Sequence, residues 1–577
     1  MASLPPTPRP TADFAKSAGS DGAEQCSAIP LLRPEQGGDH GSLRSQPVGC
    51  ATLGRPGAGA MAILEQLQRH GVKPGRLTSD SRRVQPGDVF LAFPGAQADG
   101  RDFIAQALAR GASAVIAEAG SMIGAVDRPL VQVKGLAWLS GELAHLAYGR
   151  PSEHLWLAGV TGTNGKTSVT QWIAQALNTL PYLPPGRPRA VTVLCTESRS
   201  DEHQSPLSPG KGTGERLNKC AVIGTLGNGF LGALDESPNT TPDAITLHAA
   251  LAGFVAQGAQ ACAMEVSSIG LDQGRINGAA VDVAVLTNLT RDHLEYHGTM
   301  QAYAAAKEKL FLVPGLGAAV LNLDDAFGVD LAARLRGRMR IIGYASSAVD
   351  VGSADEMLRA EDLRISAAGI EFKLRGVKFS APVVGRFNAS NLLAVIGALL
   401  ARGERLEEIA VALRGIQPPP GRMQVIGGVR QPLVVVDYAH TPDALEQALG
   451  VLRETAAGRG GRLVCVFGCG GDRDPGKRPQ MGDVAARLAD RVLVTSDNPR
   501  GEDPLTIIAG IVAGMPPPRR IEPDRAQAII AAVLEADARD VILVAGKGHE
   551  SYQEIAGVRH PFSDLDAAKS ALAERRP

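Results

Sequence analysis

The sequence predicts an α/β protein with parallel sheets, and two features carry this prediction. Short runs rich in β-branched residues alternate with Ala- and Leu-rich helical stretches from residue 61 onward. Each run is followed by a loop that contains Gly or Asn, as expected where a parallel strand leads into a crossover helix. The predicted strands are Leu155 to Val160, Val281 to Thr287, Leu433 to Asp437, Leu463 to Phe467, Val492 to Thr495 and Val541 to Ala545. Ligands of such sheets bind at the carboxyl ends of the strands, so we expect the chemistry in these loops.

Composition and charge exclude several classes of protein. Hydrophobic residues make up 44% and charged residues 21% of the 577 residues, which is typical of a globular chain and not of a disordered or fibrous one. The net charge of −1 argues against a surface that binds nucleic acid. No apolar run approaches the roughly 18 residues that a membrane span needs. We therefore expect no nucleic-acid partner and no membrane segment.

The seven cysteines are an odd number scattered along the chain. Such a pattern does not indicate a disulfide framework and favours a reducing, cytoplasmic compartment. Cys465 and Cys469 flank a glycine loop without a second cysteine pair, and we interpret them as structural thiols rather than zinc ligands.

Two segments differ from the rest of the chain. Residues 1–60 are rich in Pro, Gly, Ser and Ala, lack the apolar core of a secretory signal and contain too many acids for a transit peptide. Because the sequence from Met61 has the pattern of an amphipathic helix, we expect either that translation starts at Met61 or that residues 1–60 form a disordered tail. Residues 180–219 are rich in Pro, Gly and Ser and are expected to form a solvated insertion before a strand at Cys220 to Gly224.

The strongest motif is a glycine-rich loop between a buried strand and a helix. The strand that starts at Leu155 leads into Gly162-Thr163-Asn164-Gly165-Lys166-Thr167-Ser168. Backbone N–H groups of such a loop converge on phosphate oxygens, and the following helix N-terminus adds a positive field, so the loop predicts ATP binding. Lys166 would bridge the β- and γ-phosphates, and Thr167 is placed to bind Mg²⁺. The spacing is not the standard one, because Val160 stands where the first Gly belongs and Gly162 takes over the turn.

Four further loops carry polar residues after predicted strands: residues 264–268, 288–294, 437–442 and 497–500. Glu265 in the first loop is either a metal ligand or a capping residue. His293 in the second is either structural or, in the company of Asp292 and His297, a metal ligand. Arg500 in the fourth offers a planar fork suited to a carboxylate, and the alternative is an ordinary Asn-Pro turn.

In this order the loops resemble the Mur ligases, the ATP-dependent amino-acid ligases of peptidoglycan synthesis. The matching segments are GTNGKTS (162–168), EVSS (265–268), TNLTRDHLEYHG (287–298), GRFNASN (385–391), DYAHTPDAL (437–445) and GCGGDRDPGKRP (468–479). The resemblance covers 61–577 and implies a cytoplasmic enzyme, expected to be a monomer. Within the family, the DNPR loop at 497–500 is that of members that add meso-diaminopimelate to UDP-N-acetylmuramoyl-L-alanyl-D-glutamate, whereas lysine-adding members usually have another residue in place of the Arg.

The resemblance also implies roles for individual residues. Those expected at the uridine nucleotide are Ser79, Ser81, Gln97 and Ala98, and those at the muramoyl dipeptide are Asn239, Thr240, Thr241, Ser267, Gln273 and Arg275. Asn388 and Asn391 match the signature next to the adenine, and Asp437 is assigned to the same ATP site. The diaminopimelate pocket is matched by Arg473, Asp497, Asn498, Pro499, Arg500, Gly546 and Glu550. The sequence departs from the family at Ala96 and Ile269, where His is common.

The implied reaction activates a carboxylate on the γ-phosphate of ATP, so positive charge must supply much of the rate. By resemblance, Thr167, Glu265, His293 and Lys307 hold two Mg²⁺ ions, and Lys166, His293 and Lys307 are the catalytic residues. Lys307 matches a lysine that CO₂ carbamylates in this family, which turns an ammonium into an oxygen ligand. The amine of diaminopimelate then attacks the acyl phosphate, and Arg500 pairs with its distant carboxylate.

The organisation expected from the resemblance is a small α/β domain for the uridine diphosphate at 61–150, a central phosphate-loop domain for ATP at 151–420, and a C-terminal Rossmann-like domain for the amino acid at 421–577. The alternatives are a folylpolyglutamate synthase, a Mur ligase that adds D-glutamate or D-Ala-D-Ala, and a non-catalytic protein that keeps the nucleotide fold. The segments TSDSR (78–82) and GAQADGR (95–101), both in the first expected domain, argue against the folate enzyme, and so does the DNPR loop.

Overall fold

The structure is a computed structural model that describes residues 58–95, 98–120, 123–124, 126–181, 218–346, 352, 354–366, 369–428, 430–516 and 520–575. Residues 1–57 and 182–217 lie outside this part of the chain, and so do Ala96 and Gln97. The expectations for the N-terminal tail, for most of the insertion and for Gln97 therefore remain expectations.

The first sheet has four parallel strands in the order β1-β2-β3-β4. Its elements are α1 (Ala58–Arg69), β1 (Leu77–Thr78), η1 (Ser81–Arg83), β2 (Val89–Ala92), η2 (Gly100–Phe103), α2 (Ile104–Ala109), β3 (Ala114–Glu118), β4 (Leu130–Val133) and α3 (Leu136–Ala147). Successive strand residues point to opposite faces. Leu91 of β2 therefore packs with α1 and α3, while Phe90 packs with α2. Helix α1 begins at Ala58, just before the start expected at Met61.

The central sheet has nine strands in the order β13-β12-β11-β10-β5-β9-β6-β7-β8. Its strands are β5 (Trp156–Thr161), β6 (Cys220–Gly224), β7 (Gly227–Phe230), β8 (Ala233–Asp235), β9 (Ala261–Glu265), β10 (Val283–Leu286), β11 (Ala318–Asn322), β12 (Arg340–Ala345) and β13 (Glu356–Arg359). Neighbouring strands from β13 to β6 run parallel, and only the pairs β6–β7 and β7–β8 are antiparallel. The carboxyl ends of β5, β9 and β10 thus meet at one edge, which positions the loops that follow them.

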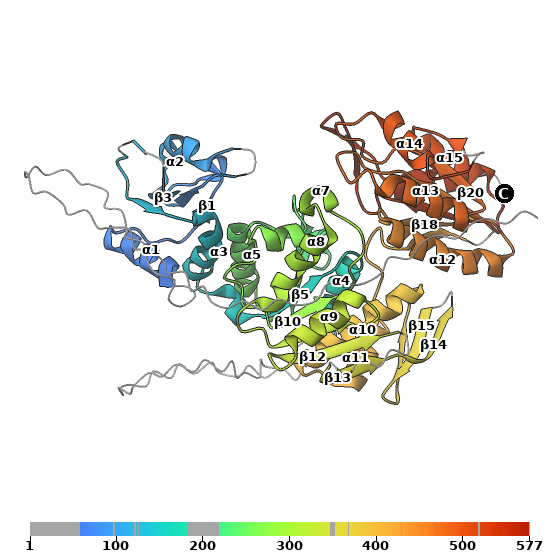
Figure 1. Ribbon diagram of the computed structural model, residues 1–577, viewed down its shortest axis with the longest axis horizontal. Coiled ribbons are helices and arrows are strands. Elements are labelled where there is room, and N and C mark those ends of the chain that lie inside the picture. Colours follow the sequence, from blue (N-terminus) through green and yellow to red (C-terminus); the bar gives the residue numbers. More distant parts are fainter. Residues whose placement is uncertain are drawn as a thin grey trace, which may run out of the picture. The chain divides into compact units, whose positions relative to one another are not determined.

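Helices cover both faces of this sheet (Figure 1). On one face lie α4 (Lys166–Leu177), α10 (Arg386–Arg402) and α11 (Leu406–Leu413), together with the antiparallel sheet β14 (Glu361–Ser366), β15 (Gly369–Leu374) and β16 (Val377–Ala381). On the other lie α5 (Ala244–Ala256) and α9 (Ala326–Leu335). The shorter elements are η3 (Pro151–His154) before β5, α6 (Ser268–Asp272) after β9, and α7 (Leu294–His297), α8 (Met300–Glu308) and η4 (Lys309–Leu312) after β10.

The third sheet has six strands in the order β17-β18-β22-β19-β20-β21, parallel except for β17 against β18. These strands are β17 (Gln424–Gly427), β18 (Leu433–Asp437), β19 (Leu463–Phe467), β20 (Arg491–Val494), β21 (Arg520–Ile521) and β22 (Val541–Ala545). One face carries α12 (Pro442–Arg459), α13 (Lys477–Leu488) and α14 (Pro504–Val512), and the other carries α15 (Arg525–Glu535) and α16 (Asp564–Glu574). A hairpin of β23 (Tyr552–Ile555) and β24 (Val558–Pro561) follows β22.

The structure confirms the α/β class with parallel sheets. Each strand predicted from the sequence is present. The bounds of β6, β18, β19 and β22 are those predicted, whereas β5 and β20 are displaced by one residue and β10 is shorter than the run that predicted it. The two described ends of the insertion lie together, because the Asn218 amide donates hydrogen bonds to the carbonyls of Leu180 and Pro181 at 3.1 and 2.9 Å. Among the described residues, none of the helices combines the length and the apolar character that crossing a membrane would require.

Candidate active site

The glycine-rich loop lies between β5 and α4, packed against the loop that follows β10. The Thr163 and Asn164 amides donate to the Asn288 carbonyl and side-chain oxygen at 2.9 and 2.8 Å, and the Thr287 hydroxyl donates to the Asn164 carbonyl at 2.6 Å. A Cβ atom at Gly162 would lie 1.8 Å from the Thr287 hydroxyl, so only glycine fits at this turn. This contact explains why residue 162 is a glycine.

Two lysines meet at the carbonyls of this loop, the buried Lys307 and the partly buried Lys166. The Lys166 ammonium donates to the carbonyls of Gly162 and Thr163 at 2.9 and 2.8 Å, and the Lys307 ammonium donates to the Gly162 carbonyl at 2.8 Å. Burial lowers the pKa of Lys166, and burial together with the charge of Lys166 lowers the pKa of Lys307 well below its ordinary value. Both amines are thus held in an environment that disfavours a second positive charge and favours an anion.

The two asparagines of α10 lie beside the same loop. A Cβ atom at Gly165 would lie 2.5 Å from the Asn391 side-chain oxygen. The Asn391 amide donates to the Asn388 oxygen at 3.0 Å, and the Asn388 amide donates to the Val384 carbonyl at 2.7 Å. Ser168 is buried in the first turn of α4. The structure therefore brings Asn388, Asn391 and the glycine-rich loop together at one side of the sheet.

Glu265, at the end of β9, is buried and surrounded by hydroxyl groups. Its carboxylate accepts hydrogen bonds from the Thr167 hydroxyl at 3.0 Å and from the amide and hydroxyl of Thr225 at 2.9 and 3.1 Å. The Thr167 hydroxyl also accepts a hydrogen bond at 3.0 Å from the guanidinium of Arg422, which lies 4.4 Å from the centre of the Tyr438 ring. Glu265 thus contacts the first turn of α4 directly and is not merely a cap at a strand end.

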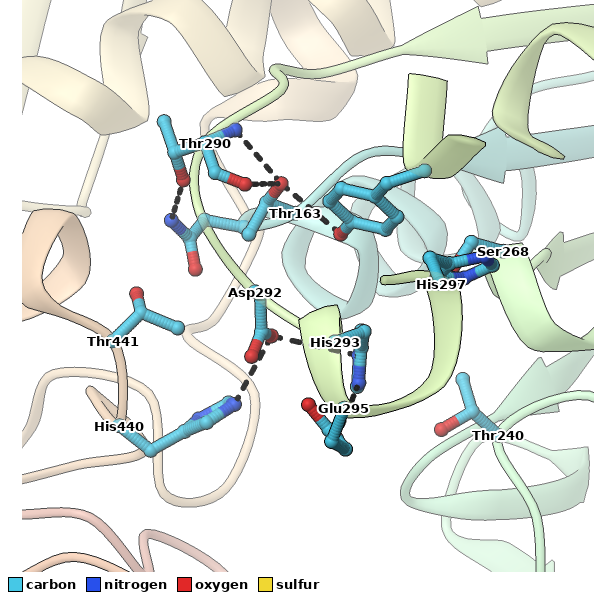
Figure 2. A network of polar contacts seen from close by, with 12 residues as sticks. Thr163, Thr240, Ser268, Thr290, Asp292, His293, Glu295, His297, His440 and Thr441 are labelled. Carbon is cyan, nitrogen blue, oxygen red and sulfur yellow. Dashed lines mark hydrogen bonds and ion pairs between the residues drawn. The ribbon is translucent and has the colours of Figure 1, made fainter. Parts of the chain in front are cut away.

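The loop after β10 places charged side chains around His293 (Figure 2). His293 has a left-handed backbone with a φ of 53°, and its ring nitrogens lie 3.5 Å from Asp292 and 3.6 Å from Glu295. Asp292 is buried, which would raise its pKa, but the two histidines at its side (His293 and His440) and Lys477 lower it well below its ordinary value. The described contacts join His293 to these carboxylates and do not join it to Thr167 or Glu265.

The Tyr303 side chain connects this loop to the glycine-rich loop. It is fully buried, and its hydroxyl lies 3.2 Å from the Thr163 hydroxyl, which also accepts from the Thr290 amide at 2.9 Å and lies 3.1 Å from the Thr290 carbonyl. Figure 2 shows the Thr163 and Thr290 side of this network. The Lys307 ammonium lies 4.4 Å from the centre of the Tyr303 ring. Tyr303 therefore fixes Thr163 and covers Lys307 at the same time.

The donor set fits magnesium in part. In the part of the chain that the structure describes, no group of three or more His, Cys, Asp or Glu side chains is arranged to hold a metal ion by itself. The Thr167 hydroxyl and the Glu265 carboxylate are adjacent oxygen donors, the type of ligand that Mg²⁺ prefers. An unmodified Lys307 ammonium has no lone pair to donate to a metal, so Lys307 fits only after its amine is converted to an oxygen ligand.

The residues expected at the muramoyl dipeptide form a second group next to Glu265. The Thr241 hydroxyl donates to the Glu265 carbonyl at 3.0 Å and lies 3.2 Å from the Ser267 hydroxyl. The hydroxyl oxygens of Thr240 and Thr225 lie 3.0 Å apart. The Arg275 guanidinium donates to the Thr241 carbonyl at 2.7 Å and to Gln273 at 2.7 and 3.0 Å. Asn239 is tied into the same loop, because its carbonyl accepts from the Ser237 hydroxyl at 2.8 Å.

The residues expected at the uridine nucleotide differ in exposure. Ser81 is buried, and its hydroxyl donates to the Gln106 side chain at 2.6 Å, so in this structure the hydroxyl has an internal partner. Ser79 and Ala98 are exposed, and the Ala98 carbonyl accepts from the Gly95 amide at 2.8 Å. Gln97 lies outside the described residues.

The residues expected at diaminopimelate converge at the carboxyl ends of β20 and β22. A Cβ atom at Gly546 would lie 2.4 Å from the Asp497 carboxylate. The side-chain amide of Asn498 donates a hydrogen bond to the Glu550 carboxylate at 2.7 Å. The backbone amide of Arg500 donates to the Glu554 carbonyl at 3.0 Å, so the loop that contains Pro499 is hydrogen-bonded to β23. A Cβ atom at Gly470 would meet both Arg500 and Arg473, so these two side chains flank one glycine. The Arg500 guanidinium donates to the Gly471 carbonyl at 2.8 Å.

A fully buried ion pair supports this pocket from behind. Arg525, in the first turn of α15, makes two hydrogen bonds of 2.7 Å to Asp564, in the first turn of α16. The same guanidinium donates to the carbonyls of Ser496 and Ala545 at 3.2 and 2.8 Å. These carbonyls immediately precede Asp497 and Gly546, so the ion pair holds the two strand ends that carry the pocket.

Asp437 and the C-terminal cysteines have clear local environments. The Asp437 carboxylate accepts from the Met423 amide at 2.7 Å, and burial raises its pKa. Cys465 and Cys469 are buried, burial raises the pKa of both thiols, and the Cys469 sulfur lies 3.6 Å from that of Met481. These surroundings are typical of structural thiols.

Several residues of the site were missed by reasoning from the sequence. Arg422 stands at the expected start of the C-terminal domain, just after a run of prolines, and carries no motif that would indicate its contact with Thr167. Tyr303 precedes Lys307 by one helical turn on α8, a spacing that could have indicated contact between the two. Thr225, Lys547 and the Arg525–Asp564 pair carry no local signal, because their partners are distant in the sequence or belong to no recognised motif.

Comparison with known proteins gives three family matches along the chain. Residues 76–148 match the model described as the Mur ligase family, catalytic domain. Residues 213–399 match the Mur ligase middle domain, and residues 421–548 match the Mur ligase, glutamate ligase domain. The order of the matches follows the order of the three large sheets.

The chain is also similar to characterised relatives and solved structures. It is 50% identical over 512 residues, 87% of this chain and 96% of the relative, to the UDP-N-acetylmuramoyl-L-alanyl-D-glutamate--2,6-diaminopimelate ligase of Ectopseudomonas mendocina. A solved structure with the same enzyme name is 37% identical, with a TM-score of 0.57, and covers 87% of this chain and 95% of its own. The MurF ligase of Thermotoga maritima, solved in complex with ADP, shares the fold at 17% identity with a TM-score of 0.58, covering 88% of this chain and 99% of its own. Since a relative that is half identical is matched over nearly its whole length, this chain belongs to the Mur ligase family.

Proposed function

We propose that this protein is the ATP-dependent ligase that joins meso-diaminopimelate to the D-glutamyl γ-carboxylate of UDP-N-acetylmuramoyl-L-alanyl-D-glutamate, releasing ADP and phosphate. The observation that carries the proposal is the 50% identity, over 96% of its length, to a relative named for this ligation. The Asp497 to Arg500 loop, which matches the diaminopimelate-adding members of the family, agrees with this choice of amino acid.

The glycine-rich loop supports ATP as the phosphate donor. The N-terminus of α4 provides a positive field, and Lys166 adds a full charge beside the carbonyls of Gly162 and Thr163. Because burial lowers the pKa of Lys166, an incoming phosphate would both gain a partner and stabilise the charged form of the amine. Asn388 and Asn391 lie beside Gly165, in reach of the nucleotide that such a loop binds.

The residues proposed to hold magnesium are Thr167, Glu265 and His293, together with a carbamylated Lys307. When bound, Mg²⁺ supplies positive charge to the phosphates and to the carboxylate that approaches them. The lowered pKa of Lys307 supports carbamylation, since only a neutral amine has the lone pair that reacts with CO₂. Asp292 and Glu295 flank the His293 ring and hold its orientation.

Arg500 supports the choice of diaminopimelate over lysine. Its guanidinium bonds to the Gly471 carbonyl and forms no ion pair with a carboxylate of the described residues, which leaves its charge for a substrate carboxylate. Lysine ends in an ammonium where diaminopimelate carries a second carboxylate as well as an ammonium. A pocket built for that carboxylate rejects the analogue without it, because the arginine would then be left without its partner.

The proposed reaction has two steps. The γ-carboxylate of the D-glutamyl residue attacks the γ-phosphorus of ATP, ADP leaves, and an acyl phosphate forms. The free amine of diaminopimelate then attacks the acyl carbon, loses a proton, and displaces phosphate to form the amide. Lys166 neutralises charge in the first step, in which two anions meet.

The proposed organisation follows from the sheets. We assign the uridine diphosphate to a domain of residues 61–150, ATP to a domain of residues 151–420, and the amino acid to a domain of residues 421–577. We also propose that the protein acts as a cytoplasmic monomer. Sedimentation of the purified protein and fractionation of cells test these two points.

The test is phosphate release from ATP in the presence of UDP-N-acetylmuramoyl-L-alanyl-D-glutamate and magnesium, with meso-diaminopimelate compared to L-lysine. We expect turnover that requires the dipeptide nucleotide and strongly prefers diaminopimelate. A preference for lysine would keep the ligase and overturn the interpretation of Arg500. Turnover only with folate and glutamate, or with neither amino acid, would overturn the proposal.

A further inference from the structure

Lys547 is a buried cation inside the proposed amino-acid pocket, and the proposed reaction does not use it. Its side chain is 0% exposed, and its ammonium donates hydrogen bonds to the Asn498 oxygen and to Glu550, each at 3.0 Å. The centre of the Tyr552 ring lies 5.4 Å from the same nitrogen. A charge taken out of water is tolerated only when it is paired and hydrogen-bonded, so these contacts hold Lys547 in one position.

The backbone around Lys547 explains how the side chain reaches this position. Strand β22 ends at Ala545, and the next residue, Gly546, has a φ of +117° and lies against the Asp497 carboxylate. The close approach leaves no space for a side chain at 546 and turns the chain at the strand end. The Lys547 side chain therefore lies next to the loop that contains Asp497 and Asn498.

Lys547 and the Glu554 backbone amide together determine how the Asn498 side-chain amide is oriented. The Asn498 oxygen accepts from the Lys547 ammonium and from the Glu554 amide at 2.9 Å. Both partners are obligatory donors, so the oxygen of the side chain must face them and the NH₂ group must face away. That NH₂ group donates to Glu550 at 2.7 Å. The orientation of the Asn498 side chain is thus fixed by its hydrogen-bond partners and not only by packing.

Glu550 is held through one of its two oxygens. The same oxygen, Oε2, accepts from Asn498 at 2.7 Å and from Lys547 at 3.0 Å. Among the described residues no hydrogen bond to the other oxygen, Oε1, is found, and the side chain is 15% exposed. A carboxylate fixed in this way presents its second oxygen to a ligand, and an ammonium group is the partner that suits it.

We propose that Lys547 is a positioning residue for the amino-acid substrate: it fixes Glu550 and Asn498 so that Glu550 Oε1 receives an ammonium of diaminopimelate. This inference rests on the proposed function and adds the residue that orders the pocket. Lys547 and Glu550 together carry no net charge, which suits a substrate with two ammoniums and two carboxylates better than an unpaired carboxylate would.

The first test is Lys547→Met, which keeps the length of the side chain and removes the charge. We expect the KM for meso-diaminopimelate to rise at least about tenfold, since a charged hydrogen bond that orders the binding group is lost. The KM values for ATP and for the dipeptide nucleotide should stay within about twofold. The matched control is Lys569→Met, on the exposed side of α16, which should change none of these values.

The second test is a double-mutant cycle with Glu550→Gln. If Lys547 acts through Glu550, the double variant should bind diaminopimelate no more weakly than Glu550→Gln alone, rather than showing the product of the two single effects. The double variant contains no unpaired buried charge, so it can be compared with the wild-type protein if either single variant fails to fold, and a KM for diaminopimelate within about twofold of the wild-type value would then overturn the positioning role.

The outcomes separate the two proposals. An unchanged KM for diaminopimelate in Lys547→Met, an equal rise in the KM for ATP, or a double variant tenfold weaker than Glu550→Gln would each overturn the positioning role and leave the ligase intact. A wild-type protein that does not use diaminopimelate would overturn the proposed function, and the inference about Lys547 with it.

Discussion

The cations of the glycine-rich loop and those of the amino-acid pocket have different kinds of partner. At the loop, the Lys166 and Lys307 ammoniums bond to backbone carbonyls. In the pocket, Lys547 pairs with Glu550, and Arg525 behind it pairs with Asp564. The first arrangement leaves positive charge in excess, and the second cancels it. This difference corresponds to the two proposed ligands, because ATP is a polyanion whereas diaminopimelate is a zwitterion.

The pKa values of the two lysines at the glycine-rich loop are lowered. Burial lowers the pKa of Lys166, and burial and Lys166 together lower that of Lys307. Carbonyl dipoles satisfy the hydrogen bonds of these amines without neutralising them. The site therefore gains most when an anion arrives, which is the condition for stabilising charge that develops during phosphoryl transfer.

Arg500 and Arg473 are exceptions in the pocket, and they sharpen the comparison. The Arg500 guanidinium bonds to the Gly471 carbonyl and the Arg473 guanidinium to the Asp472 carbonyl, as the lysines of the loop bond to carbonyls, while Lys547 and Arg525 have carboxylate partners. We interpret Arg500, like Lys166 at the loop, as reserved for an anionic group of a substrate.

The largest effect is expected at Lys166. Lys166→Met should lower kcat for phosphate release about 10³-fold, because the charge that approaches the transferred phosphate is lost. Steady-state assays with all three substrates measure it. The control is Lys378→Met on β16, where the side chain is 64% exposed and the charge should be dispensable. A fall of less than tenfold at Lys166 would show that carbonyl-bonded cations do not serve the reaction.

The next effect is on stability, at the Arg525–Asp564 pair. Arg525→Met should lower the free energy of unfolding by about 3 kcal/mol, since Asp564 would remain buried without its partner. Denaturant unfolding measures the change. The double variant Arg525→Met/Asp564→Leu should recover most of the loss, because both charges are then absent. A double variant as unstable as the single one would mean that the carbonyl contacts to Ser496 and Ala545 matter more than the charge pair.

A smaller effect, on specificity, is expected at Arg500. Arg500→Ala should reduce the preference for meso-diaminopimelate over L-lysine by about 10- to 50-fold in kcat/KM, the equivalent of about 1.4 to 2.3 kcal/mol. Competition assays with both amino acids measure the ratio. Arg559→Ala on β24, which removes an exposed guanidinium beside Tyr552, serves as the control. A variant of Arg500 that loses activity without changing the ratio would exclude it as the selecting residue.

The sequence predicted the parts of the molecule that depend on local patterns. Strand runs such as Leu463 to Phe467 and Val541 to Ala545 were located to the residue, because buried parallel strands are continuous apolar runs bounded by loops. The loops after them carry the residues of the glycine-rich loop and of the pocket. Since carboxyl ends of parallel strands share an edge, their convergence could be inferred before the structure.

The rest could not be predicted because it depends on partners far apart in the chain. The Arg525–Asp564 pair joins the first turns of two helices, and neither residue belongs to a motif. Lys547 stands between two glycines in an unremarkable loop, and only the fold shows that its ammonium meets Asn498. The contacts of the His293 ring with Asp292 and Glu295 are a matter of side-chain orientation that no sequence pattern fixes, and its role as a magnesium ligand stays a prediction.

The smallest effect is expected at Tyr303, whose hydroxyl supports the glycine-rich loop from beneath. Tyr303→Phe removes one hydrogen bond of 3.2 Å to the Thr163 hydroxyl. Thr163 keeps the Thr290 amide as donor and the Thr290 carbonyl as acceptor, so no buried polar group is left without a partner. The loss should therefore be about 1 kcal/mol, seen as a rise of about fivefold in the KM for ATP. The phenyl ring that covers Lys307 is retained, so kcat should change little. A fall in kcat comparable to that of Lys166→Met would mean instead that the hydroxyl, and not the ring, governs the reactivity of the lysines at this loop.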